Sequence, residues 1–316
     1  MKTLYLDCFS GISGNMFVGM LLQAGIPFEK FESAMAELGL SGYALLHESV
    51  NKLGIQSLYY NVLLDSEDHH DHDHDHDHDH DHDHDHDHDH DHDHGHDHDH
   101  DHDHDHDHDH GHDHDHDHDH GHDHNHDHDV MQGVDVAGHH HHHEHRGLPE
   151  ITKIIEAAAI SDAIKAKSLA VFGKLAAAEA KVHGVPVEEI HFHEVGAVDC
   201  MLDIVGTVWA LDYLGIEQIG VSPLHVGSGF VRCAHGIMPV PAPATAELLT
   251  GLPVYSTDIK GELVTPTGAA LVQTLSSYAG PRPQGFIYSQ VAYGAGSKNL
   301  SIPNVLRGFI GEAEAF

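Results

Sequence analysis

The sequence predicts an α/β protein, a mixed strand and helix domain that is interrupted by a long disordered insertion rich in histidine and aspartate. Three observations support this fold class. Strand-like and helix-like segments alternate through residues 1–65 and 148–316, and residues 66–147 are dominated by aspartate and histidine. The first segment alone is marginal in size for an independent core. We therefore expect residues 1–65 and 148–316 to form one domain around the insertion, rather than two small domains.

The N-terminal segment predicts a strand, a glycine turn and a helix in succession. Residues 3–8 alternate in polarity and are rich in strand formers. A glycine-containing turn then leads into a helical run that ends at Gly25. A second helix is expected at residues 29–38, with strands near residues 43–50 and 57–64.

The C-terminal segment continues the alternation. Ser161 suits the N-cap of a long amphipathic helix that runs to His183. Residues 196–214 are too apolar for a surface helix and include Trp209, so we expect a core helix there. The other expected elements are helices at residues 148–158, 246–249 and 269–278, and strands at residues 216–221 and 225–232.

The insertion is a candidate for binding transition metals. Its Asp-His alternation covers residues 68–129 and holds most of the chain's 43 histidines and of its formal net charge of −38. Imidazole suits Ni, Zn, Cu and Co, so this tract should bind many divalent ions without sharp selectivity. A solvated linker with no selected role is the alternative explanation. A second cluster follows and supplies six more candidate ligands, which are His139, His140, His141, His142, His143 and His145.

Composition argues against several classes of protein. The 14 lysines and arginines are scattered, so no basic face for nucleic acid is visible. No apolar run reaches the roughly 18 residues of a membrane span, and Asp7 interrupts the N-terminal apolar run that a signal peptide would need. The three cysteines, Cys8, Cys200 and Cys233, are odd in number and widely separated, which argues against a disulfide framework. We expect a cytoplasmic protein.

The turn after the first strand is a candidate binding site. Asp7 stands at the end of the strand, where its carboxylate could bind a metal ion, and backbone N–H groups at the following helix start could bind a phosphate. The turn lacks the lysine of a Walker A motif and the spacing of the dinucleotide fingerprint. A turn that only fits a tight strand–helix corner is the alternative. The residues of this candidate phosphate site are Ser10, Gly11, Ser13 and Gly14.

The densest cluster of metal-binding residue types, residues 191–199, follows the long helix. If this stretch is extended, His191 and His193 point to the same side. If a helix follows, Asp199 and Asp203 lie on one face as an i,i+4 pair. Two imidazoles with Glu194 or Asp199 would make a compact site for a divalent metal ion. Two structural histidines bound to nearby carboxylates are the alternative.

A second pair of metal-binding residue types lies further along the chain. Cys233 and His235 are two residues apart and could share one face, as a soft and a borderline ligand would need. A buried thiol beside a loop histidine is an equally good explanation of this pair.

Two later turns could contact anions. Thr265 suits an N-cap, with a proline at the first helical position, so N–H groups near Thr267 and Gly268 could bind a phosphate. A plain helix start is the more frequent meaning of this pattern. Further on, Lys298 and Arg307 flank another glycine-rich turn, which makes a plausible anion-contacting loop.

Together these motifs resemble the LarC family of nickel insertion proteins, in the same order and over essentially all of both folded segments. The motifs that carry the resemblance are DCFSGISGNM at residues 7–16, HFHEVGAVDCMLD at residues 191–203, AHGIMPVPAPATAELL at residues 234–249, the turn at residues 265–268, YGAG at residues 293–296 and PNVLR at residues 303–307.

The resemblance implies a specific reaction. The substrate would be a pyridinium bis-thiocarboxylate mononucleotide, and Ni²⁺ would bond to its ring carbon and its two sulfurs to form the nickel-pincer cofactor of lactate racemase. The family's reaction, a lyase-class cyclometallation, depends on CTP with Mn²⁺ or Mg²⁺. The tract would concentrate nickel. The candidate bases and nickel ligands are His191, His193 and Glu194. The turns at residues 10–14 and 265–268 would hold the 5′-phosphate.

The chain departs from the family in two respects. Family members usually continue beyond the PNVLR motif into a C-terminal domain that is associated with nucleotide handling, so CTP would bind through that region or a separate C-terminal polypeptide. Asn15 stands where many relatives carry Asp. A nickel storage or chaperone protein, with the tract as its functional part, is the competing function. Besides the substrate and CTP, the expected partners are a separate C-terminal polypeptide of the family and, in a homo-oligomer, a second copy of the chain.

Overall fold

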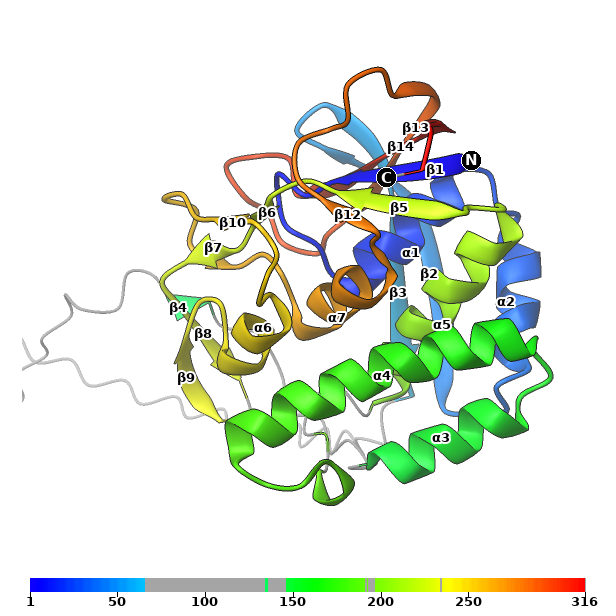
Figure 1. Ribbon diagram of the computed structural model, residues 1–316, viewed down its shortest axis with the longest axis vertical. Helices are drawn as coiled ribbons and strands as arrows, with labels where there is room; N and C mark the ends of the chain where they lie inside the picture. The colour runs from blue at the N-terminus through cyan, green and yellow to red at the C-terminus, as the bar shows by residue number, and fades with distance from the viewer. Residues whose placement is uncertain (66–133, 136–145, 191, 193–196, 234, 316) are drawn as a thin grey trace, which may run out of the picture. The chain divides into compact units, whose positions relative to one another are not determined.

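The computed structural model describes residues 1–65, 134–135, 146–190, 192, 197–233 and 235–315 (Figure 1). These residues belong to one compact unit formed by residues 1–67 and 129–316. The predicted fold class is therefore confirmed: a mixed α/β domain is interrupted by the Asp/His-rich stretch. The Asp-His alternation and the cluster from His139 to His145 lie outside the described residues.

A seven-stranded mixed sheet organises the domain. Its strand order is β12-β5-β1-β14-β13-β3-β2. The interior strand β1 runs parallel to β5 and antiparallel to β14, and β13 joins the β2–β3 hairpin through a short parallel pairing. The strands are β1 (Lys2–Asp7), β2 (Tyr43–Lys52), β3 (Ile55–Leu64), β5 (Gln218–Val221), β12 (Tyr278–Ala279), β13 (Ile287–Ala295) and β14 (Val305–Glu312).

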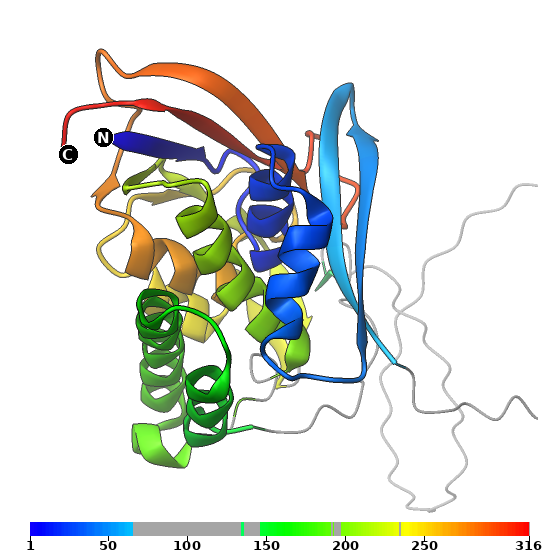
Figure 2. The same ribbon diagram turned by 90° about the vertical axis from the view of Figure 1, so that its right-hand side faces the viewer.

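In both views the helices gather on one face of β1, β5, β13 and β14 (Figures 1 and 2). Helix α1 packs directly under β13 and β14 and against α5, and α4 crosses α5, α6 and α7. The helices are α1 (Gly14–Gln23), α2 (Phe28–Ala36), α3 (Leu148–Ala157), α4 (Asp162–His183), α5 (Val198–Tyr213), α6 (Pro243–Leu248) and α7 (Pro266–Leu275), with a 3-10 turn at Val187–Glu189. No helix among the described residues combines the length and apolar character needed to cross a membrane.

Short strands form three smaller sheets beside the main one. β6 (Leu224–His225) pairs with β10 (Val254–Tyr255), and β7 (Gly227–Ser228) pairs with β11 (Gly261–Glu262). β8 (Phe230–Cys233) and β9 (Gly236–Pro239) form a hairpin. On the other side of β8 lies β4 (Val134–Asp135), a short strand inside residues 66–147, which were predicted to be disordered throughout.

Helix caps follow the sequence predictions closely. The Ser161 hydroxyl accepts the backbone N–H of Ile164 at 3.4 Å, and the Thr265 hydroxyl accepts that of Gly268 at 3.2 Å. The predicted core helix exists as α5, and Trp209 is only partly buried in it, packed edge-on against Phe31.

Three predicted elements are corrected. The strand predicted at residues 225–232 is broken into β6, β7 and β8 because Gly227 and Gly229 adopt positive φ angles. The helix predicted at residues 269–278 ends at Leu275, since the backbone N–H of Ser277 bonds to Ile219 and draws the chain into β12 beside β5. The helix predicted at residues 246–249 is α6, which already begins at Pro243.

Glycines allow α1 to approach the sheet closely. A Cβ atom on Gly294 of β13 would lie 1.8 Å from the Met16 carbonyl oxygen and 2.5 Å from the Met20 nitrogen. A Cβ atom on Gly19 would lie 2.6 Å from the Leu58 carbonyl oxygen. The YGAG motif therefore has a packing role, because its first glycine seats α1 on β13.

We predict that Gly294→Ala lowers the free energy of unfolding by about 3 kcal/mol, because the added methyl has no room beside the α1 backbone. Gly173→Ala is the matched control: it lies inside α4 with nothing within 4 Å of its Cβ position, so it should stabilise the protein by about 0.5–1 kcal/mol. Denaturant unfolding of both variants tests this. Equal stability of Gly294→Ala and wild type would contradict the packing assignment.

Candidate functional site

The candidate site begins at the carboxyl end of β1. β1 and β5 are parallel, so their carboxyl ends meet at one edge of the sheet, where α/β proteins usually bind ligands. The Cys8 backbone N–H donates to the Ser222 hydroxyl at 2.9 Å, and the His225 N–H donates to the Cys8 carbonyl at 3.2 Å. The buried His225 ring is fixed between the Phe9 carbonyl (2.8 Å) and the Thr257 hydroxyl (2.9 Å). The chain leaving β1 is therefore held by several hydrogen bonds.

The two turns that the sequence analysis singled out lie side by side. The Ile12 N–H donates to the Leu263 carbonyl at 2.9 Å, and the Thr265 N–H donates to the Ile12 carbonyl at 3.1 Å. Their contact is so close that a Cβ on Gly11, whose φ is +80°, would lie 1.9 Å from the Leu263 oxygen. A Cβ on Gly268 would lie 2.3 Å from the Ile12 oxygen. The structure thus brings residues 10–14 and 265–268 together.

Three helices begin at this place. The Asn15 backbone N–H, in the first turn of α1, donates to the Asp203 carboxylate of α5. The Cys200 thiol of α5 lies 3.3 Å from the Thr267 hydroxyl of α7. The N-terminal turns of α1, α5 and α7 therefore meet, and each brings the partial positive charge of a helix N-terminus. Such a junction favours an anionic ligand.

Side chains of the protein already bind some of the N–H groups at this junction. Asp203 lies against the start of α1, and a Cβ on Gly14 would lie 2.4 Å from its Oδ2 atom. The N–H of Gly268 is bound by the Thr265 side chain, and the buried Ser10 hydroxyl donates to the Asn304 side chain at 3.5 Å. Among the predicted phosphate-binding residues, Ser13 and Thr267 are partly exposed. Their hydroxyls are also engaged, since Ser13 Oγ donates to Asn15 Oδ1 at 2.5 Å and Thr267 Oγ1 lies 3.3 Å from the Cys200 thiol, so a ligand would have to compete with these contacts.

Buried polar atoms lie beneath the junction. Desolvation by burial, followed by the charge of Asp199, raises the pKa of Asp203 well above the usual carboxyl range. Burial also raises the pKa of Cys200, which favours the neutral thiol at this position. Among the described residues, the buried Asp203 Oδ1 and Tyr60 Oη atoms have no hydrogen-bond partner. This region therefore favours protonated, neutral groups.

The structure gives Asp7 a partner of its own. Arg307 donates to Asp7 Oδ2 through Nη2 at 2.5 Å and through Nε at 3.0 Å, and its guanidinium also stacks over Phe9 and Phe309. Lys298, which was predicted to contact anions together with Arg307, is also engaged within the protein: its ammonium donates to the Glu262 backbone carbonyl at 3.0 Å. Both cations of the predicted anion-contacting loop therefore have partners in the fold. Asp7 could bind a metal ion only in competition with this arginine.

The remaining predicted site residues are distributed as follows. His191, His193 and Glu194 lie outside the described residues, but their neighbour Phe192 is buried and Ala197 caps α5. Asp199 lies in the first turn of α5, two residues after that cap. Within the described ranges, no three His, Cys, Asp or Glu side chains are close enough to hold one metal ion. No local pattern in the sequence predicted the contacts of Asp203 and Thr267, although the helical spacing placed Asp203 on one face with Asp199.

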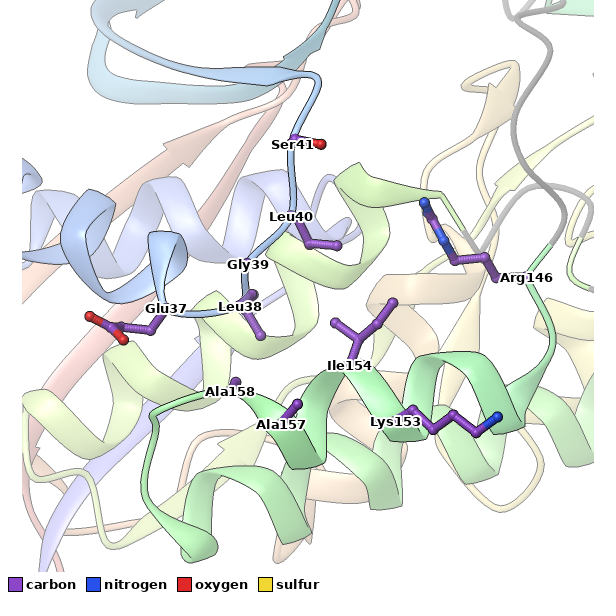
Figure 3. Close-up of a pocket in the computed structure, with 10 residues that line it drawn as sticks. All are labelled: Glu37, Leu38, Gly39, Leu40, Ser41, Arg146, Lys153, Ile154, Ala157 and Ala158. Carbon is purple, nitrogen blue, oxygen red and sulfur yellow. The ribbon is translucent and has the colours of Figure 1, made fainter.

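An open pocket of about 570 Å³ lies between the segment that follows α2 and helix α3 (Figure 3). Its walls combine apolar side chains with the cationic Arg146 and Lys153. None of the predicted site residues lines it. The lining residues are Glu37, Leu38, Gly39, Leu40, Ser41, Arg146, Lys153, Ile154, Ala157 and Ala158.

Fold and site define an α/β protein with an anion-attracting junction of helix starts at the carboxyl edge of a mixed sheet. The chain belongs to the family described as nickel insertion protein, which it matches over residues 4–316.

Curated relatives agree with this assignment. The chain is 39% identical over 312 residues to the pyridinium-3,5-bisthiocarboxylic acid mononucleotide nickel insertion protein of Desulfitobacterium hafniense (strain DSM 10664 / DCB-2), covering 99% of the chain and 59% of that relative. It is 39% identical over 316 residues to the protein of the same name from Geobacillus kaustophilus, covering 99% and 60%. A putative nickel insertion protein of Dictyoglomus thermophilum is 34% identical over 312 residues, covering 99% and 61%. The chain thus spans about three fifths of the length of these relatives. No solved structure matches it.

We predict that Asp203→Asn stabilises the protein increasingly as pH rises above about 4. A carboxyl whose pKa is higher in the folded than in the unfolded state, where it is about 3.9, destabilises the fold as it ionises. Asparagine keeps an acceptor for the Asn15 N–H and cannot ionise. Thermal unfolding of variant and wild type between pH 4 and pH 8 tests this, since titration of the histidines cancels in the difference.

Asp203→Ala is the companion variant. It leaves the Asn15 N–H without its acceptor, so its free energy of unfolding should be about 1–3 kcal/mol below that of Asp203→Asn at every pH, since neither variant ionises at this position. A stability difference between Asp203→Asn and wild type that does not change with pH would show that Asp203 is ionised throughout the range.

Proposed function

We propose that this chain is the nickel- and substrate-handling part of an enzyme that inserts Ni²⁺ into pyridinium-3,5-bisthiocarboxylic acid mononucleotide. The observation that carries this proposal is the junction of three helix N-terminal turns at the edge of the sheet. The family match over residues 4–316 and the names of the Desulfitobacterium and Geobacillus relatives support it.

The charge of such a substrate suits the junction. A mononucleotide carries a phosphate, and two thiocarboxylates add further negative charge, so helix N-termini attract it. Ser13 and Thr267 offer hydroxyls at the same place. Because Cys200 is a neutral thiol, it would not compete with the substrate's sulfurs for nickel.

The insertion step requires a base. A nickel–carbon bond and two nickel–sulfur bonds form, the ring C–H bond breaks, and the proton passes to a nearby acceptor. Histidine or carboxylate side chains suit this task. Asp199 in the first turn of α5 and the adjoining His191, His193 and Glu194 are our candidates for the base and for the ligands that hold nickel before transfer.

Nickel supply and nucleotide use are assigned to other parts of the protein. We propose that the Asp-His tract and the cluster from His139 to His145 concentrate Ni²⁺, because imidazole ligands bind and release such ions. CTP with Mn²⁺ or Mg²⁺ would be handled by the part of the family's length that this chain does not span, either on a separate polypeptide or within a longer protein. The product would serve lactate racemase-type enzymes.

The decisive experiment follows the mass of the product. The purified chain is mixed with the bis-thiocarboxylate mononucleotide, Ni²⁺, Mn²⁺ and CTP, with and without the C-terminal region of a relative. We expect the nickel-bearing product when that region is supplied. Product from the chain alone would place CTP use within these residues. Absence of product under both conditions, with many Ni²⁺ ions bound per chain, would instead establish nickel storage as the function.

A pair of variants separates nickel supply from insertion. Deletion of residues 68–145 should raise the nickel concentration needed for half-maximal insertion about tenfold or more, since local ligand density is lost, and should leave the maximal rate nearly unchanged. His193→Ala should abolish insertion at any nickel concentration. His47→Ala, an exposed histidine on β2, is the matched control and should insert normally. Normal insertion by His193→Ala would remove His193 from the site.

A further inference from the structure

A second group of metal-binding side chains lies away from the helix junction, where the C-terminal end of α4 meets the β8–β9 hairpin (Figure 1). The His183 Nε2 atom is 3.6 Å from Glu179 Oε2 on the preceding turn of α4. The ring of His235, from the hairpin, has its centroid 4.9 Å from that of His183. Cys233 is on the same hairpin and is partly exposed. None of these residues belongs to the site described above.

The fold fixes both halves of this group. Gly184 ends α4 in the left-handed conformation with φ +68°, so His183 is the last residue of the helix. The Lys181 ammonium binds the Glu247 carboxylate at 2.6 Å and ties the same helix end to α6. In the hairpin, Cys233 pairs with Gly236, which places His235 in the turn between them. Residues about fifty positions apart are thus held together by regular structure.

The spacing suits a shared metal ion. Two ligand atoms that each lie about 2.1 Å from one ion are at most about 4.2 Å apart, and the His183–Glu179 distance falls within this limit. The side chains are partly open to solvent, 27% for His183 and 17% for Glu179, so an ion can reach them. A third ligand requires a small movement, because no three such side chains in the described ranges stand close enough at present. The exposed His235 ring can turn toward His183 by changing rotamer.

The end of the insertion is attached to the same hairpin. β4 pairs in parallel with β8, with Val134 opposite Phe230 and Asp135 opposite Val231. Because the pairing is parallel, Asp135 lies nearer than Val134 to the Cys233 end of β8. His139 follows four residues later, a length of chain that spans at most about 14 Å. In the sequence, the histidines after the alternation therefore begin only four residues after a strand that is paired with this hairpin.

We propose that Glu179, His183 and His235 form a Ni²⁺-binding site, with Cys233 as its fourth ligand, that receives ions from the histidine-rich insertion. Imidazole, carboxylate and thiolate donors together suit a borderline ion such as Ni²⁺ and disfavour Mg²⁺ or Ca²⁺. A site with few ligands of different chemical types also supplies selection that a long tract of equivalent ligands lacks. The claim that this site passes nickel on to the substrate rests on the proposed function. The claim that the site binds Ni²⁺ does not depend on that function.

Alkylation of Cys233 reports on this site in the full chain, although the insertion binds nickel as well. Cys8 and Cys200 are buried, so Cys233 is the accessible thiol among the three cysteines. We expect Ni²⁺ to slow its reaction with iodoacetamide about tenfold, because a coordinated thiolate is a poor nucleophile. Mg²⁺ should have no effect. Peptide mass spectrometry measures the modified fraction at each time.

Variants assign the protection to this site. The double variant His183→Ala/His235→Ala should lose the Ni²⁺-dependent protection of Cys233 while still binding nickel through the insertion. His47→Ala should keep the protection. As a second readout, Ni²⁺ should slow amide hydrogen exchange in residues 176–190 of wild type and not of the double variant. Equal protection in wild type and the double variant, or no effect of Ni²⁺ on either readout, would overturn the proposal.

An insertion assay at limiting nickel separates this inference from the proposed function. If the site feeds nickel to the substrate, the double variant needs several-fold more Ni²⁺ for half-maximal insertion and reaches the normal maximal rate. Protection of Cys233 by Ni²⁺ in a protein that inserts no nickel under any condition would leave the ion site standing and refute the proposed function.

Discussion

The seating of α1 against the sheet is the contact on which the rest of the structure depends. Gly294 and Gly19 let the helix backbone touch the strands, and a glycine in β14, Gly308, gives room to the Met20 side chain. With the helix in this position, its first turn meets Asp203 of α5 and its preceding turn bonds to residues 263–265. A helix standing even a methyl group further out would separate the three helix starts.

The electrostatics of the junction follow from this packing. Helix N-termini make the place attractive to anions, yet the protein has put its own carboxylate, Asp203, at one of them. Burial and the neighbouring Asp199 favour the protonated form of that carboxyl, so the positive end of α1 is not fully neutralised. The same environment keeps Cys200 protonated. Because burial favours the neutral forms of Asp203 and Cys200, neither side chain cancels the partial positive charge of the helix N-termini.

Local signals in the sequence predicted the helices well, because a 3.6-residue period and caps such as Ser161 and Thr265 depend on neighbouring residues alone. β13 and β14 were not predicted, since glycines such as Gly294 and Gly308 replace apolar residues where α1 approaches and so blur the two-residue alternation. The approach of His183 to His235 had no local signal at all. The turns at residues 10–14 and 265–268 were each recognised, but only the tertiary fold shows them in contact.

The position of β1 has a consequence for biogenesis. β1 is an interior strand of the sheet, and its two neighbours are β5 and β14, which follow it by more than two hundred and about three hundred residues. The sheet therefore has a high contact order, which slows folding. On the ribosome, β1 must wait, unpaired, until the histidine-rich insertion and the helices up to α5 have been synthesised, and its second neighbour β14 follows only after α6 and α7. Nascent chains of this protein are thus natural clients for chaperones that shield exposed apolar segments.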